Sequence, residues 1–268
     1  MANELEQKIE AMSRAGVILG GALDEVLTHA KPGVTELELN DIVDKYITKN
    51  GGYPGFKKVP GYKHAICACT NEVVVHGIPK KRVLKKGDII CIDTGVFVDG
   101  YHTDMGETIK IGEKIVDTVS DTDKVGIFLS VGKQTMWKAI EQAIPGNRVG
   151  HISQVIQEAV EGAGYSVVKN LVGHGVGKTL HEKPEIPGIL MGSIEKTPII
   201  KDGMTLAIEV IYNMGGPSVE YDGTDGWTIV TSDGSLSAVF ERTILVSENG
   251  PILLTKLHSD ELTRRLAL

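Results

Sequence analysis

The sequence predicts an α+β fold with pseudo-twofold symmetry, in which helices cover an antiparallel sheet. One observation is that a unit of helix, Pro-Gly turn, helix and strands occurs twice along the 268 residues. A duplicated unit of this kind favours two similar helical layers packed on one sheet. The other is that runs rich in β-branched residues are separated by turns containing Asp-Gly, which is typical of antiparallel hairpins.

The N-terminal part of the chain predicts two consecutive helices. The first is expected over about residues 4–30, because apolar residues recur there at helical spacing until Pro32 and Gly33 interrupt the pattern. Thr35 is predicted to begin the second helix, since Glu38 follows at the spacing of a capping box. The apolar face of the second helix and the glycines that end it are Leu39, Ile42, Val43, Ile47, Gly51 and Gly52.

This helical unit reappears 113 positions later, where Ala-Lys-Pro-Gly at 30–33 is matched by Ala-Ile-Pro-Gly at 143–146. The same shift aligns the apolar faces of the helices that follow, pairing Leu39 with Ile152 and Ile47 with Val160. The alternative is that Pro-Gly followed by an amphipathic helix is a common local pattern. We predict one catalytic domain over residues 1–268, with an internal duplication of about 9–110 and 122–250.

The strands are clearest in two predicted hairpins. The first joins residues 88–98 to the run that starts at Tyr101, across Asp99-Gly100. The second joins residues 227–231 to residues 236–246, across Ser-Asp-Gly at 232–234. In both, the Asp-Gly turn between β-rich runs is a strong short-range signal for antiparallel pairing.

Composition excludes several classes of protein. The net charge of −7 does not suggest a protein that coats nucleic acid. The three cysteines, Cys67, Cys69 and Cys91, are odd in number and form no CxxC pair, which argues against a disulfide scaffold and predicts a reducing, cytoplasmic location. The first residues lack the pattern of a signal peptide. No segment reaches the ~18 apolar residues expected of a membrane span.

Two carboxylates are predicted to share one face of the first hairpin. Asp93 lies in an apolar strand, where a carboxylate is costly without a partner. With a two-residue turn at 99–100, Asp93 faces Gly106 and Gly95 faces Asp104, so Asp104 lies one diagonal step from Asp93 on the same face. Carboxylates this close repel unless a proton or a cation intervenes. The alternative is that one of them faces solvent.

Two further carboxylates interrupt apolar strands: Glu209, and Glu241 beside Arg242. A buried ion pair is one explanation for each glutamate. Arg242 is a poor partner for Glu241, however, because adjacent residues of a strand face opposite sides.

Three histidines lie in contexts that suggest a site. His174 stands between two glycines, where backbone can approach an ion or substrate closely, and His181 follows seven residues later. His76 follows an apolar strand, where an ordinary hydrogen-bonding role is the alternative. The remaining histidines, His29, His102, His151 and His258, are expected to be surface or structural residues. Together with the four carboxylates, an imidazole makes a mixed N/O donor set that suits two divalent ions such as Mn, Fe, Co or Zn.

With these carboxylates and histidines, the chain resembles the type I methionine aminopeptidases. The resemblance runs from the first helix to about Asn249 and is strongest in five segments, at residues 71–79, 87–104, 173–184, 203–209 and 225–244. It implies the pita-bread fold and removal of the N-terminal methionine from nascent proteins with a small second residue. It also implies a hydroxide between two metal ions that attacks the first peptide carbonyl.

The resemblance also implies residue roles. Asp104 and Glu241 match carboxylates that bridge the two ions. Asp93 matches a ligand of one ion, and His174 and Glu209 match ligands of the other. Glu209 further resembles a proton shuttle. The residues that match substrate contacts are His76 and His181 at the scissile peptide, and Tyr62, Cys67 and Trp227 around the methionine side chain.

Some positions depart from the family pattern. Leu180 stands where many relatives carry an aromatic residue, which is expected to change the shape of the methionine pocket. Arg242 replaces a histidine that is common after the last glutamate. Met105, Gly106 and Glu107 are unusual after the second aspartate. None of these departures removes a predicted ligand.

Three other classes of protein fit the sequence less well. A prolidase or X-Pro aminopeptidase of the same fold usually carries an extra N-terminal domain, which is not expected here because the repeat begins near residue 11. A type II methionine aminopeptidase usually carries a large insertion, which the 31 residues between Glu209 and Glu241 exclude. A non-catalytic binding module usually loses ligands, whereas all five are present here. The basic run at residues 80–86 is a possible ribosome contact near the exit tunnel, although a solvated loop is the simpler explanation.

Overall fold

The computed structural model describes residues 2–112, 123–223 and 225–260 as an α+β fold of helices and antiparallel strands, as predicted. In the N-terminal half, the elements are α1 (Ala2–His29), α2 (Glu36–Lys49), β1 (Tyr53–Pro54), the short 3-10 helix η1 (Gly55–Lys58), β2 (Ile66–Thr70), β3 (Val73–Val75), β4 (Ile89–Val98) and β5 (Tyr101–Lys110). No helix in the described ranges is long and apolar enough to cross a membrane.

The C-terminal half begins with α3 (Lys124–Glu141) and α4 (Val149–Gly162). These helices are followed by β6 (Ser166–Val167), β7 (Val172–Gly175), β8 (Glu182–Pro187), the 3-10 helix η2 (Ile194–Lys196), β9 (Thr205–Asn213), β10 (Val219–Tyr221), β11 (Ile229–Thr231), β12 (Ser237–Leu245) and β13 (Ile252–Leu253). The bounds of α4 are those of α2 shifted by 113 positions. The internal duplication itself stays a prediction, and residue 122, where its second half was expected to start, lies outside the described residues.

The local signals at the first two helices act as predicted. α1 ends before Pro32-Gly33, and α2 begins after Thr35, whose side chain accepts from the Glu38 N–H while Glu38 accepts from the Thr35 N–H. This capping box satisfies two otherwise unpaired donors, and an N-cap of this kind stabilises a helix by about 1 kcal/mol.

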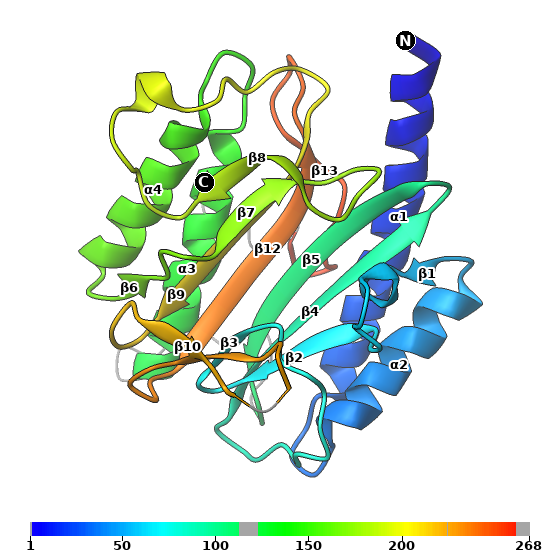
Figure 1. The fold of residues 1–268 in the computed structure, drawn as a ribbon. Helices are drawn as coiled ribbons and strands as arrows, with labels where there is room; N and C mark the ends of the chain where they lie inside the picture. The colour runs from blue at the N-terminus through cyan, green and yellow to red at the C-terminus, as the bar shows by residue number, and fades with distance from the viewer. Residues whose placement is uncertain (1, 113–122, 224, 261–268) are drawn as a thin grey trace.

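Two hydrophobic cores lie between helices and strands. In one, residues of α1 and α2 such as Leu23 and Val43 pack on β2, β4 and β5; in the other, residues of α3 and α4 such as Phe128 and Ile156 pack on β9 and β12. Figure 1 shows the two helical pairs on opposite sides of the long strands, which run between them. The middle parts of the long strands β4, β5, β9 and β12 carry the carboxylates of the candidate site.

The second predicted hairpin is wrong, although both of its strands exist. β11 pairs with β10 and β3, whereas β12 pairs with β9 and β13. The turn at 232–234 does form, with Gly234 at φ +71°. It therefore passes the chain from one sheet to another, because the fully buried β12 is taken up by the long ladder with β9.

Candidate active site

The hairpin of β4 and β5 places Asp93 and Asp104 on one face. Asp99 and Gly100 form its turn with φ values of +46° and +91°, the left-handed conformation that two-residue hairpin turns require. Asp93 pairs with Gly106 and Gly95 pairs with Asp104, so the predicted register is confirmed. Asp104 is 4% exposed. The two carboxylates are therefore diagonal neighbours within a mostly buried surface.

The other half of the chain contributes Glu209, Glu241 and His174. Glu209 on β9 and Glu241 on β12 are directly opposite one another in the ladder. Like charges directly opposite each other destabilise a strand pair unless something neutralises them. His174 lies on the neighbouring strand β7, where its Nδ1 faces the Gly175 carbonyl oxygen at 2.9 Å. That contact leaves Nε2 directed toward the carboxylates.

These residues converge from both halves of the chain. Asp104, His174 and Glu241 each offer a ligand atom, and the three atoms all lie within 4.8 Å of one another. His174 Nε2 is 3.7 Å from Glu209 Oε1 and 4.0 Å from Asp104 Oδ2. These separations are longer than direct hydrogen bonds, so the His174 imidazole lies beside both carboxylates without bonding to either.

The electrostatics of the cluster favour a cation. Asp93 Oδ1 and Glu241 Oε1 are buried without a hydrogen-bond partner among the described residues, which is costly for a carboxylate. Burial raises the pKa of Asp93 to about 7, although a hydrogen bond with Asp104 acts in the opposite direction. Burial, reinforced by neighbouring carboxylates, also raises the pKa values of Asp104, Glu209 and Glu241 well above their ordinary range. A divalent ion among these oxygens would remove both penalties.

His76 and His181 lie beside this cluster without pairing to its carboxylates. His76 has φ +56°, an uncommon conformation for a residue other than glycine that is often found at functional sites. Gly77 after it packs so closely on Ala68 that a Cβ there would lie 2.2 Å from the carbonyl oxygen. The His181 ring packs edge-on against His174 at 4.4 Å between centroids. Burial lowers the pKa values of both imidazoles, so both are neutral near pH 7.

One cavity of about 130 Å³ contains all these groups. It is smaller than the roughly 300–1,000 Å³ typical of drug-sized ligands, which suits a single side chain. Every predicted site residue lines it: Tyr62, Cys67, His76, Asp93, Asp104, His174, His181, Glu209, Trp227 and Glu241. Leu180, which stands where many relatives carry an aromatic residue, also lines the cavity.

Apart from the carboxylates and histidines, the lining of the cavity belongs to one hydrophobic cluster. The Tyr62 hydroxyl donates to the Ile66 carbonyl oxygen at 2.8 Å, and its ring packs edge-on against Trp227 at 5.2 Å. Cys67 pairs with Asp93 in the β2·β4 ladder, which joins the apolar lining to the carboxylate cluster. The sequence did not identify four lining residues, Phe56, Val59, Val75 and Val239. Phe56 lies in η1 and Val59 directly follows it, and no periodic pattern signals their position.

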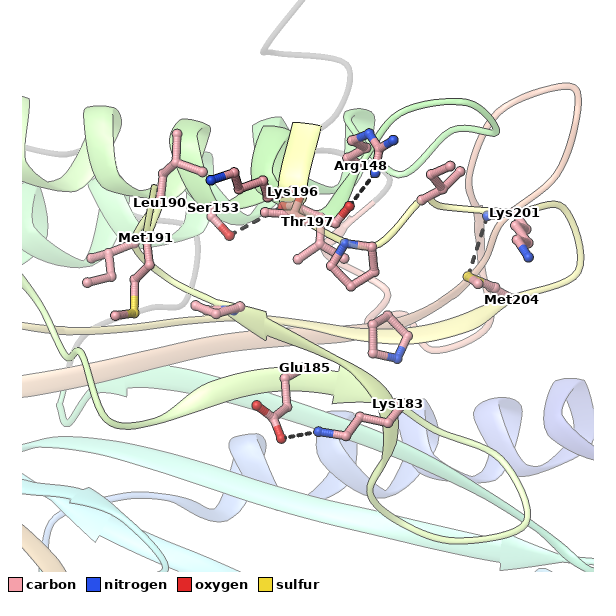
Figure 2. A pocket seen from close by; sticks show the side chains of 16 residues that line it. Arg148, Ser153, Lys183, Glu185, Leu190, Met191, Lys196, Thr197, Lys201 and Met204 are labelled. Carbon is pink, nitrogen blue, oxygen red and sulfur yellow. Dashed lines mark hydrogen bonds and ion pairs between the residues drawn. The ribbon is translucent and has the colours of Figure 1, made fainter. Parts of the chain in front are cut away.

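A larger hollow of about 790 Å³ lies elsewhere, between β8, the start of α4 and residues 189–201 (Figure 2). It has one carboxylate in its lining, Glu185, which pairs with Lys183 at 2.5 Å. None of the predicted ligands lines this hollow, and no histidine does. It therefore has no part in the candidate active site.

The histidines expected to be structural or at the surface lie away from the cavity. His102 is buried and packs against Phe97 at 4.7 Å. His151 accepts at Nδ1 from the Arg148 N–H at the start of α4. His29 and His258 are exposed beside Glu25 and Asp24 respectively.

The fold and the site define the chain as a metallopeptidase. The profile of Metallopeptidase family M24 matches residues 10–248, and the chain belongs to that family. The chain is similar to methionine aminopeptidases. It is 41% identical over 251 residues to the methionine aminopeptidase of Clostridium acetobutylicum, covering 93% of this chain and 96% of that protein. It is 42% identical over 251 residues to methionine aminopeptidase 1 of Bacillus subtilis, covering 94% and 97%.

Solved structures agree with this assignment. The methionine aminopeptidase of Thermotoga maritima superposes with a TM-score of 0.87 at 41% identity, covering 93% of this chain and 97% of that one. The prolidase of Pyrococcus furiosus gives a TM-score of 0.73 at 22% identity and covers 94% of this chain but 64% of that one. The second likeness shows the fold alone. The predicted pita-bread fold is confirmed.

Proposed function

We propose that this chain is a metal-dependent aminopeptidase that releases the N-terminal methionine of nascent polypeptides. The observation that carries the proposal is the convergence of ligand atoms of Asp104, His174 and Glu241 within 4.8 Å of one another, in a cavity whose remaining lining is mostly apolar. The membership of metallopeptidase family M24 supports the same reaction class.

The donor set fits two divalent ions, for which we propose Co, Mn, Fe or Zn. Asp104 and Glu241 would be shared by both ions, Asp93 would hold one, and His174 with Glu209 would hold the other. The buried, unpartnered oxygens of Asp93 and Glu241 support this fit, and carboxylate and imidazole donors suit these metals. Bound ions would act as Lewis acids on the scissile carbonyl and would lower the pKa of a water molecule.

The other groups would act on protons and on the substrate. Glu209 would take a proton on its carboxylate and pass it to the leaving amine, which requires a base within hydrogen-bond reach of both. The neutral imidazoles of His76 and His181 would donate N–H groups to the carbonyl oxygen as negative charge develops on it. Tyr62, Cys67 and Trp227 would surround the methionine side chain, whose thioether makes favourable contacts with sulfur and aromatic rings.

The proposed partner is the N-terminus of a nascent chain, in the cytoplasm. The three cysteines support this location, because all are buried thiols and none forms a disulfide. The basic run at residues 80–86 is the candidate ribosome contact. Lys80 already pairs with Asp222 and Asp225, and Arg82 pairs with Glu72. A solvated loop therefore explains the run better than docking at the exit tunnel does.

Removing the metal tests the proposed reaction. We expect chelator-treated chain to leave the peptide Met-Ala-Ser intact, and Mn(II) or Co(II) to restore release of methionine, because the ions activate both reacting groups. Acetyl-Met-Ala-Ser is the control, since an exopeptidase needs a free α-amine. Metal-independent hydrolysis, or equal cleavage of the acetylated peptide, would contradict the proposal.

The substitution Leu180→Phe tests whether Leu180 determines which N-terminal residue of the substrate is accepted. We expect wild type to cleave Met-Ala at least about 10-fold more efficiently than Met-Leu, because a packed wall beside the ligand strands rejects a large second residue. We also expect partial activity on Leu-Ala, since Leu180 is a branched side chain at the cavity. The ratio of Leu-Ala to Met-Ala efficiency should fall in Leu180→Phe, by about 10-fold for a pocket change of this size.

The control for this substitution is Ile199→Phe, which adds the same ring at an exposed position in the other hollow. It should leave both ratios unchanged. Efficient cleavage of Met-Leu would argue against the tight wall. An unchanged Leu-Ala to Met-Ala ratio in Leu180→Phe would show that Leu180 does not shape the pocket.

A further inference from the structure

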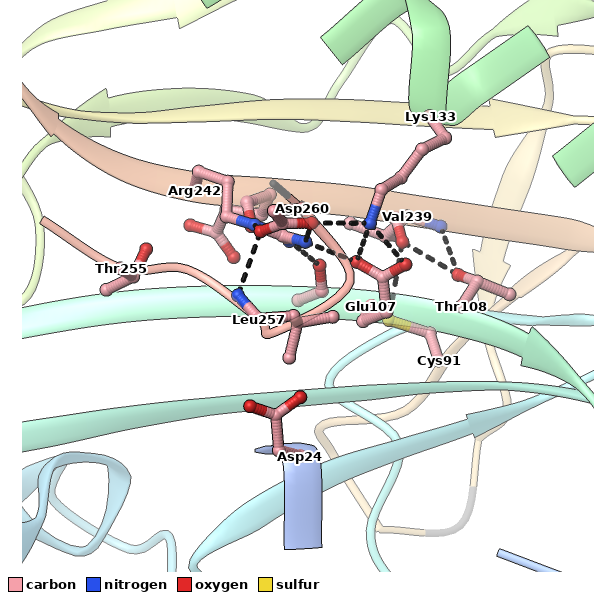
Figure 3. Close-up of polar contacts among 12 residues, drawn as sticks. Asp24, Cys91, Glu107, Thr108, Lys133, Val239, Arg242, Thr255, Leu257 and Asp260 are labelled. Atoms are coloured by element: carbon pink, nitrogen blue, oxygen red, sulfur yellow. Dashed lines mark hydrogen bonds and ion pairs between the residues drawn. The ribbon is translucent and has the colours of Figure 1, made fainter. Parts of the chain in front are cut away.

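Arg242 directly follows the candidate ligand Glu241 on β12, and its side chain is fully buried. The expectation that it does not pair with the Glu241 carboxylate agrees with its contacts. Its guanidinium meets Glu107 of β5 and Asp260 of the C-terminal segment instead (Figure 3). The residue that departs from the family pattern therefore lies directly behind the proposed metal centre.

The guanidinium belongs to a buried network of two cations and two carboxylates. Arg242 donates to Glu107 Oε2 at 2.6 Å, and to the two Asp260 oxygens at 2.8 and 2.9 Å. Lys133 of α3 donates to Glu107 Oε1 at 2.7 Å and to Asp260 Oδ1 at 3.0 Å. The charges balance, which a buried ionic cluster requires. The network ties together β5, α3, β12 and the C-terminal segment.

The seam between β5 and β12 has no backbone ladder among the described residues. Side chains join the two strands instead. The Thr243 hydroxyl donates to the Asp104 carbonyl oxygen at 2.8 Å and accepts from its N–H at 2.9 Å. The Thr108 hydroxyl donates to the Val239 carbonyl oxygen at 2.7 Å and accepts from the Val239 N–H at 3.0 Å. The spacing of the two strands thus depends on a few side chains, and the candidate ligands Asp104 and Glu241 lie one on each strand.

Arg242 makes the central contact of this seam. Its Nη1 donates to the carbonyl oxygen of Glu241 at 2.7 Å and to that of Gly106 at 3.2 Å. Gly106 is the residue opposite Asp93 in the β4·β5 ladder. A Cβ at Gly106 would lie 3.5 Å from the Glu241 Cβ, so the strands are in close approach at this point.

The C-terminal segment brings Asp260 to the network along α1. Gly16 and Gly20 of α1 admit this segment, because a Cβ at either would lie 1.9 or 2.2 Å from the carbonyl oxygen of Leu254 or Lys256. Asp260 is 1% exposed and also accepts from the Leu257 N–H at 2.9 Å. The segment is therefore held against α1 and delivers one carboxylate into the buried network.

We propose that Arg242, anchored by Glu107 and Asp260, is a positioning residue that fixes β5 against β12 and so sets the separation of Asp104 and Glu241. The inference rests on the metal centre proposed above. Arg242 touches neither ion nor substrate in this arrangement. Its effect passes through the backbone carbonyls of Glu241 and Gly106, as outer residues that orient metal ligands do.

The experiment measures Mn(II) binding by calorimetry to the full, chelator-treated chain, at a temperature where each variant is folded. We expect Arg242→Met to weaken Mn(II) binding at least about 10-fold, the effect typical of groups that orient ligands. Asp260→Asn, which keeps its shape and loses its charge, should weaken binding by a smaller factor. Asp260→Asn decides the question if Arg242→Met does not fold.

Ile156→Ala on α4 is the matched control, because it removes buried side-chain atoms from a helix that carries no residue of the Arg242 network. It should lower stability and leave Mn(II) affinity unchanged. Wild-type affinity in folded Arg242→Met, or an equal loss in Ile156→Ala, would overturn the positioning role alone. A wild-type chain that binds no Mn(II), Co(II), Fe(II) or Zn(II) would overturn the proposed metal centre together with it.

Discussion

Asp104→Asn is expected to lose at least one metal ion and nearly all activity. Asn keeps the shape of the side chain but removes the charge that both ions would share with Glu241. A metal ion contributes several kcal/mol of transition-state stabilisation, and each 1.36 kcal/mol is tenfold in rate, so the loss should be about 10³-fold or more. Metal content after dialysis and kcat/KM on Met-Ala-Ser are the two measurements.

The same substitution should not destabilise the metal-free chain. Burial raises the pKa of Asp104 most, and repulsion from the neighbouring carboxylates raises it further. Removing the charge of Asp104 relieves that repulsion. Asp99→Asn is the matched control on the same hairpin. Asp99 is exposed, pairs with the exposed Arg14, and has a φ of +46° that asparagine tolerates. Two retained ions with near-normal turnover in Asp104→Asn would refute the ligand assignment.

The parts of the fold that local chemistry determines were predictable from the sequence. The capping box at Thr35 and Glu38 specifies the start of α2 whatever packs against it. Asp99-Gly100 specifies a two-residue turn, and the turn specifies the register of ten residue pairs between β4 and β5. The relation between Asp93 and Asp104 followed from that register, because side chains alternate along a strand.

The pairing of the second predicted hairpin was not predictable in the same way. Residues 232–234 form a turn, but β12 is long and buried and finds a better partner in β9, which is distant in sequence. A local turn signal does not report such competition between strands. The apolar lining of the cavity was not predictable for a similar reason, since Phe56 of η1 and Val75 of β3 come together only in the folded chain.

Some residues of the candidate site were likewise predictable from the sequence pattern, and others were not. A carboxylate inside an apolar strand is anomalous by itself, and that anomaly singled out Asp93, Glu209 and Glu241. His76 and His181 lack such a signal, and their roles came from the resemblance to the aminopeptidases. The φ of +56° at His76 is a backbone property that no residue pattern around it reveals. The buried partners of Arg242 were equally hidden, since Glu107 and Asp260 are 135 and 18 positions away.

His181→Ala and His76→Ala are expected to keep both ions and lose rate. Neither imidazole pairs with the carboxylates of the cluster, and each would donate to the carbonyl oxygen only as charge develops there. Removing one such donor costs about 10²–10³-fold in kcat. Because the contact strengthens in the transition state, kcat and kcat/KM should fall together with little change in KM. His29→Ala, at an exposed position on α1, should change neither metal content nor rate.

His181 could instead act only by supporting His174, since their rings touch edge-on at 4.4 Å. His181→Phe separates these roles, because phenylalanine keeps an aromatic ring beside His174 and removes the N–H donor. If His181 donates to the substrate, the Phe and Ala variants should lose rate to the same extent and keep their metal. Recovery of rate in the Phe variant would assign His181 to support of His174. Loss of metal from the Ala variant alone would point to the same conclusion, because the ligand would then depend on the ring rather than on its nitrogen.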